Sequence, residues 1–339
     1  MSQMNKQWTR RILSALLAFL LLSVPFAGCA EETGYVKEEN TGRDAVSYPY
    51  LIRTPFAVWH ISKADIELLG EDAYYEGLYA MMDLAEADFA DARAALEGYI
   101  FDEIPPIDIY TDFCNKNEMS FIAWAYYDDI HNEIRLFKGW DYACTALQHE
   151  YVHYLTMHCA DPATPPYYWA ESIADYITHY ACKNRLARSV NMGKDISRDP
   201  PEMLEAIWDE AENCVDPGRV YMVYGVYYTR GYFIGEKYFD VRNQWMTRTE
   251  DLQGRLTPEM ISYEEAAGLM AYLVDTYGRE TVFGNWTADP KHLETVFGKT
   301  FRELYSDWAA WNEEQCIQAG IIIPDLFALY AEQQADARQ

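Results

Sequence analysis

Two predicted helices separated by a proline-rich break constrain this chain more than any other feature. The first, at 140–159, contains the stretch QHEYVHYLTMHC, in which two histidines stand four residues apart. Residues four apart lie on one face of a helix, so His149 and His153 present two imidazoles to one point. The break at 161–168 should fold the second helix, at 169–187, back against the first.

This helix pair carries the residue types of a zinc site. Two histidines at this spacing supply two ligands, and Glu150 beside them can act as a general base. A catalytic zinc needs a third protein ligand and one open position. Glu171, near the start of the second helix, can meet both histidines. The alternative interpretation is a helix that merely carries two partly buried histidines.

Asp175 lies one helical turn after Glu171 and projects from the same face. Zinc-bound histidines commonly donate their second N–H to a carboxylate, which fixes the tautomer of the ring. We therefore predict that Asp175 supports one of the histidines. The alternative is a solvated acid on the surface.

The N-terminus resembles a bacterial lipoprotein signal. Lys6, Arg10 and Arg11 precede the apolar run ILSALLAFLLLSVPF, which ends in FAGC. We expect residues 1–28 to be removed and Cys29 to carry a lipid. Residues 29–47 are polar and are expected to form a flexible tether. An ordinary secretory signal is the alternative, and both interpretations place the protein outside the cytoplasm, anchored to the cell membrane if Cys29 is lipidated.

The net charge excludes some partners. The chain carries −27, and removal of residues 1–28, which hold three basic and no acidic residues, leaves −30. Such a protein is repelled by nucleic acid and by anionic headgroups, so a covalent lipid is the better membrane anchor. Half of the residues are hydrophobic, which indicates a globular protein. We expect a monomer.

The elements predict an α+β fold with two subdomains. An α/β subdomain at 48–187 should carry the metal-binding helices, and a helical subdomain should follow at 188–335. In the first, we expect strands at 55–62 and 107–112, a long helix at 71–99 and a hairpin at 120–137.

Around the third ligand the chain resembles the gluzincin zinc peptidases, which include aminopeptidase N-like and peptidase MA-like domains. Their pattern is HExxH, then a helix reading roughly W-L-x-E-G-x-A-x-Y. This chain has HEYVH and then YWAESIADY. The resemblance implies a gluzincin-type fold, Zn²⁺ as cofactor and Glu171 as third ligand, in agreement with the reasoning from the residues. The matching positions in the second helix are Glu171, Ala174 and Tyr176, with Tyr168 and Ser172 as departures.

Downstream, SYEEAAGLMAYLVDTYG at 262–278 resembles the family helix whose first tyrosine stabilises the oxyanion. The resemblance assigns that role to Tyr263. Three other tyrosines are rival donors: Tyr227, Tyr228 and Tyr232.

The family's G-x-M-E-N stretch, whose glutamate holds a substrate amine, is replaced here by SFIAWAYYDD. The resemblance, with this departure, therefore favours an endopeptidase over an aminopeptidase, and an exopeptidase that holds the substrate amine in another way is the alternative. The strand at about 120–127 would bind an extended peptide or protein substrate by pairing. Two alternatives remain: a surface lipoprotein that binds peptide or glycan without cleaving it, and a zinc hydrolase acting on another substrate.

Six cysteines remain after Cys29, and an even number outside the cytoplasm permits disulfides. Cys144 and Cys159 stand at opposite ends of the first helix, about 22 Å apart, too far to pair. If the second helix runs antiparallel, Cys144 and Cys182 lie about 10 Å and 16 Å from the metal on the same side. The geometry therefore permits Cys144–Cys182, with two buried thiols as the alternative.

Overall fold

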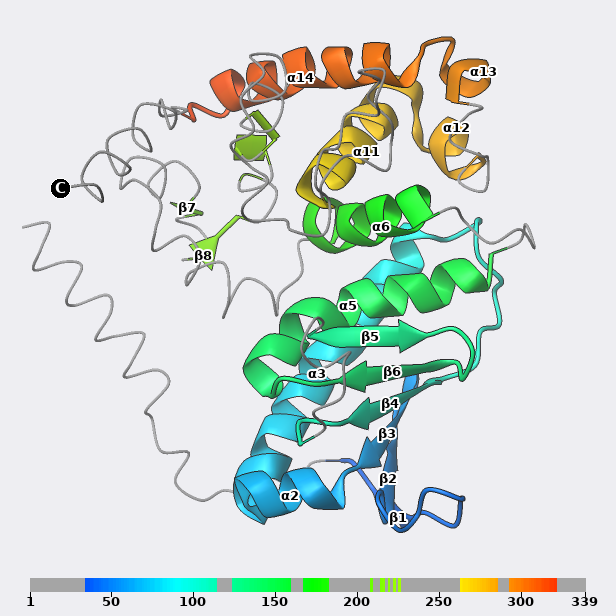
Figure 1. Ribbon diagram of the computed structural model, residues 1–339, viewed down its shortest axis with the longest axis vertical. Helices are drawn as coiled ribbons and strands as arrows, with labels where there is room; N and C mark the ends of the chain where they lie inside the picture. Colours follow the sequence, from blue (N-terminus) through cyan, green and yellow to red (C-terminus); the bar gives the residue numbers. More distant parts are fainter. Residues whose placement is uncertain are drawn as a thin grey trace, which may run out of the picture. The chain divides into compact units, whose positions relative to one another are not determined.

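A mixed six-stranded sheet organises the first half of the chain. Its strand order is β1-β2-β3-β4-β6-β5, with β5 at one edge and β1 at the other (Figure 1). The pairs β3/β4 and β4/β6 are parallel, and the pairs β1/β2, β2/β3 and β5/β6 are antiparallel. The strands are β1 (Lys37–Glu39), β2 (Tyr50–Arg53), β3 (Ala57–Ile61), β4 (Ile107–Thr111), β5 (Ala125–Asp128) and β6 (Glu133–Leu136).

The structure is a computed structural model in which Val36–Gln339 group as one compact unit and Met1–Tyr35 as another. The described residues are 34–114, 124–159, 167–182, 208–209, 214–216, 219, 222–223, 225–226, 263–285 and 293–321. Only the backbone is described at 141–145, 167–168, 208–209, 214–215 and 263–264. Among these residues no helix has the length and apolarity that a membrane crossing requires.

Parallel neighbours need a long connection, and two helices supply it between β3 and β4. They are α2 (Lys63–Leu69) and α3 (Glu71–Ala95). The buried residues of α3 recur every three or four positions and form one apolar face, which includes Tyr74, Leu78 and Phe89. The Tyr74 hydroxyl bonds Thr111 Oγ1 of β4 at 2.8 Å, so this face lies against the sheet.

Helix α5 (Trp140–Met157) shares that side of the sheet with α3 (Figure 1). The rings of Phe89 on α3 and Tyr151 on α5 stack with centroids 3.9 Å apart. The Gln148 Nε2 atom donates to the Asp88 carbonyl at 2.6 Å. These contacts, with packing of α5 against β5 and β6, fix the helix that carries His149 and His153 beside the β5 edge.

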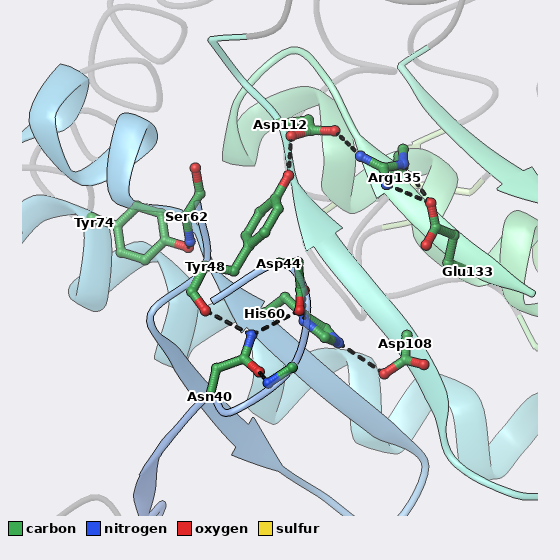
Figure 2. A network of polar contacts seen from close by, with 11 residues as sticks. Asn40, Asp44, Tyr48, His60, Ser62, Tyr74, Asp108, Asp112, Glu133 and Arg135 are labelled. Atoms are coloured by element: carbon green, nitrogen blue, oxygen red, sulfur yellow. Dashed lines mark hydrogen bonds and ion pairs between the residues drawn. The ribbon is translucent and has the colours of Figure 1, made fainter. Parts of the chain in front are cut away.

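The opposite face of the sheet is polar and is partly covered by the segment 40–48 (Figure 2). His60 of β3 is only 7% exposed. Its Nδ1 lies 3.0 Å from Asp44 of the segment, and its Nε2 lies 2.8 Å from Asp108 of β4. The Tyr48 hydroxyl donates to Asp112. The described part of the segment 29–47 therefore includes residues that pack on the sheet, which differs from the flexible tether that the sequence predicts there.

The described part of the second half is mainly helical. Its helices are α6 (Tyr167–Asp175), a π-helical turn η1 (Tyr176–Ala181), α11 (Tyr263–Tyr277), α12 (Arg279–Phe283), α13 (Leu293–Phe297) and α14 (Phe301–Gln318). Two two-residue strands also pair, β7 (Trp208–Asp209) and β8 (Cys214–Val215). Helix α11 packs against both α6 and α14. Buried Trp308 of α14 lies where a side chain at Gly268 would be, so the two helices approach closely.

The α+β prediction is thus confirmed, with a six-stranded mixed sheet and a long helix in the N-terminal half and a mainly helical C-terminal half. The predicted strands at 55–62 and 107–112 correspond to β3 and β4. The predicted hairpin at 120–137 corresponds to β5 and β6.

Candidate metal centre

The three predicted ligand side chains converge where α5 packs against α6. The Nε2 atoms of His149 and His153 are 3.0 Å apart. The Oε2 atom of Glu171 lies 3.2 Å from the first nitrogen and 3.4 Å from the second. A tetrahedral ion with bonds of about 2.1 Å holds its ligand atoms about 3.4 Å apart. The three atoms therefore already stand near the edge lengths of such a site.

The local sequence explains this convergence. One turn of α5 separates the two histidines, which places them on one face, while Tyr151, Val152 and Leu155 on the other faces are fully buried. Helix α6 begins after the proline-rich segment and brings Glu171 against that face. Each ligand side chain keeps 14–15% of its surface exposed, so solvent can reach the group.

Asp175 contacts the ligand group through the Nδ1 side of the His149 ring. Its Oδ1 lies 2.7 Å from His149 Nδ1, which directs that ring's N–H to the carboxylate and leaves Nε2 facing His153 and Glu171. Asp175 is itself 5% exposed and stands at the end of α6, before η1. Within η1, His179 brings its Nε2 to 3.8 Å from the same Oδ1.

The electrostatics of the group favour a positive charge. Burial opposes a charge on His149, but the carboxylates of Asp175 and Glu171 raise its pKa well above the usual value. Burial likewise opposes ionisation of Glu171, but hydrogen bonds to His149 and His153 lower its pKa far below the usual range. Three atoms with lone pairs at this separation repel one another unless a cation lies among them. A proton can supply this positive charge, and so can a divalent metal ion.

Glu150 occupies a different position from the ligands. Its Oε2 accepts a hydrogen bond of 2.8 Å from the backbone N–H of Tyr127 on β5. The predicted general base therefore lies between α5 and the edge strand of the sheet. The sequence does not indicate this contact, because the donor is a backbone N–H, which every residue except proline carries.

Several predicted residues fall partly or wholly outside the described part of the chain. Tyr263 is the first residue of α11, and its side chain is not described. The rival donors Tyr227, Tyr228 and Tyr232 lie outside the described residues, as does Cys29. The side chain of Cys144 is also not described, so the pairing with Cys182 stays a prediction.

A second group with metal-ligand atoms lies on the β5–β6 hairpin and comprises Asp128, His131 and Glu133. Here the carboxylates already have partners. Asp128 accepts from the turn N–H groups of Ile130 and His131, and Glu133 pairs with Arg135. His131 is 67% exposed. The His149 group is therefore the better candidate, because its three atoms face one another in a partly buried position.

Comparisons with protein-family models, with curated proteins and with solved structures each returned no match to this chain.

Proposed function

We propose that this protein is a zinc-dependent peptidase of gluzincin type, acting outside the cytoplasm from a lipid anchor at Cys29. One observation carries the proposal: His149 Nε2, His153 Nε2 and Glu171 Oε2 stand 3.0–3.4 Å from one another. Two histidines and one glutamate form the protein ligand set of a well-known class of hydrolytic zinc sites. Such sites keep a fourth position for water or substrate.

Zn²⁺ bound by these ligands would act as a Lewis acid and would lower the pKa of a water in its open position. The residues of the chain supply the remaining parts. Asp175 holds the His149 ring so that its Nε2 faces the ligand group. Glu150 would take a proton from the attacking water and deliver it to the leaving amine.

The neighbouring elements suit an extended substrate. Strand β5 ends the sheet beside α5, and its outer edge can pair with a peptide. We assign oxyanion stabilisation to Tyr263, at the start of the helix that packs against α6. Because the family's amine-binding glutamate is missing, cleavage within a peptide chain is the proposed activity.

Metal content and turnover test the proposal together. The native protein should bind one zinc ion per chain and cleave members of a quenched peptide library. Glu150→Gln should keep the zinc and lose nearly all turnover, whereas His149→Ala should lose both. His131→Ala removes an exposed histidine of the second group and serves as the matched control, because both properties should survive.

Three outcomes distinguish the alternatives. A protein without zinc, in which His149→Ala changes nothing, contradicts the metal site. Peptide binding without turnover indicates a binding lipoprotein. Zinc with hydrolysis of another substrate class alone indicates a hydrolase that is not a peptidase.

A further inference from the structure

The backbone N–H of Tyr127 points away from the sheet. In an antiparallel ladder, facing residues alternate between pairs that exchange hydrogen bonds and pairs that do not. Phe137 N donates to Trp124 O at 2.9 Å, which makes that pair hydrogen-bonded. The pair Tyr127 and Ile134 lies three positions along the register, so these two residues exchange no hydrogen bonds. The N–H of Tyr127 therefore points away from β6.

The outer edge of β5 has no neighbouring strand within the described residues. A strand edge of this kind offers its outward N–H and C=O groups to a partner. At Tyr127 the partner is the carboxylate of Glu150, whose Oε2 lies 2.8 Å from the nitrogen. The bond is charge-assisted, which makes it stronger than an ordinary backbone bond.

Among the residues that the structure describes, this contact engages one of the two oxygens of Glu150. Within the described residues, Glu150 makes one hydrogen bond, and that bond uses Oε2. A glutamate side chain otherwise rotates about three bonds, and a fixed oxygen removes most of that freedom. Glu150 follows His149 on α5, and its negative charge is one of the causes that raise the pKa of His149, so the carboxylate lies near that ring.

We propose that the Tyr127 backbone N–H is the positioning group for Glu150. It holds Oε2 on the edge strand and directs Oε1 toward the ligand group, where a proton is to be taken. The inference rests on the proposed function, since it assigns Glu150 the proton-transfer role. It also links the proposed base to the strand on which a peptide would pair.

Hydrogen exchange tests the contact without requiring metal or activity. Exchange of single amides in the full chain would be followed by mass spectrometry with fragmentation. Glu150→Ala should speed exchange at Tyr127 by about 10- to 100-fold, because no other described residue bonds this outward N–H. Glu150→Gln keeps an acceptor oxygen and should retain part of the protection. Glu97→Ala, an exposed acid elsewhere, should change nothing.

The amide of Asp128 is the internal control, since it belongs to a pair that bonds β6. Its exchange should stay constant in all three variants. Unchanged exchange at Tyr127 in Glu150→Ala overturns the proposal. So does equal acceleration of all amides of β5, which would report loosening of the strand and not loss of one bond.

Two substitutions at the strand test the consequence for turnover. Both Tyr127→Pro and Tyr127→Ala remove the phenol, but only proline removes the N–H. Proline is tolerated where an edge-strand N–H points outward, because no ladder bond is lost. With equal zinc content and similar KM, kcat should be about 10- to 100-fold lower in the proline variant than in the alanine variant.

Equal kcat values in the two variants would overturn the positioning role. If the proline variant fails to fold, the exchange measurements on Glu150→Ala still decide the proposal. If the native protein cleaves no peptide, the proposed function fails, while the exchange result at Tyr127 still shows whether the contact exists.

Discussion

The Nδ1 atom of His149 lies 2.7 Å from Oδ1 of Asp175, on the side of the ring opposite the three converging ligand atoms. This contact affects both the tautomer and the basicity of His149, and a hydrolytic metal site depends on both. The carboxylate selects the tautomer with Nε2 free for a metal, and it makes that nitrogen more basic. Asp175 is nearly buried, so its charge is only weakly screened by solvent.

Removal of that charge should weaken zinc binding. Asp175→Asn keeps an oxygen that can accept the His149 N–H but no longer raises the basicity of the ring. We expect zinc affinity to fall by about 10- to 100-fold, as measured by competition with a chelator. Asp102→Asn changes an exposed residue and should leave the affinity as it is. Equal affinities in the native protein and Asp175→Asn would show that Asp175 does not support the metal.

The ligand group could be predicted because helical geometry fixes it locally. His149 and His153 are one turn apart, and a short turn limits where Glu171 and Asp175 can lie. The same reasoning located β3, β4 and the hairpin, whose apolar residues follow strand periodicity. β1 escaped prediction because Lys37, Glu38 and Glu39 have no alternation.

Two other features could not be predicted because they depend on which strands become neighbours. His60 meets Asp108 only through the parallel register of β3 and β4. The bond from Tyr127 to Glu150 depends on which residues of β5 point outward. Sequence periodicity assigns faces to a strand, but neither its neighbours nor its register.

A disulfide between Cys144 and Cys182 would join the two ligand-bearing segments. Helix geometry predicts that the two cysteines lie on the same side of the ligand group, away from the proline-rich segment. Non-reducing peptide mapping of the native protein should yield one cross-linked peptide pair. Reduction should then lower the free energy of unfolding by about 4 kcal/mol, given the length of the enclosed loop. Two alkylatable thiols at these positions would refute the pairing.

Helices α11 and α14 pack so closely that a methyl side chain at Gly268 should lower the stability of the protein. A Cβ there would lie 2.8 Å from Cζ2 of Trp308, a rigid and fully buried ring that must move. Overpacking of this kind costs about 1–3 kcal/mol, and the better helix propensity of alanine offsets about 1 kcal/mol. Urea unfolding of Gly268→Ala should therefore show a net loss of up to about 2 kcal/mol. Gly34→Ala meets no atom within 4 Å and should be neutral; equal stabilities of the two variants would count against the close packing.

His179 should make the fold sensitive to acid. Burial, opposed by the charge of Asp175 and aided by that of His149, lowers the pKa of His179 to about 4. An unfolded chain keeps the ordinary value of about 6.5, so between these two values the unfolded state binds more protons. Stability from this residue is therefore complete above about pH 6.5 and is lost as the pH falls toward about 4.

The comparison of the native protein with His179→Gln isolates this contribution. Both would be studied with a chelator present, so that loss of metal at acid pH does not contribute. Between about pH 7 and about pH 4.5, the native protein should lose about 2–3 kcal/mol more unfolding free energy than the variant. Ile177→Val lies in the same π-helical turn and removes only a buried methylene, so it should lower stability equally at both pH values. If native protein and His179→Gln lose the same stability, His179 does not remain neutral in the folded state.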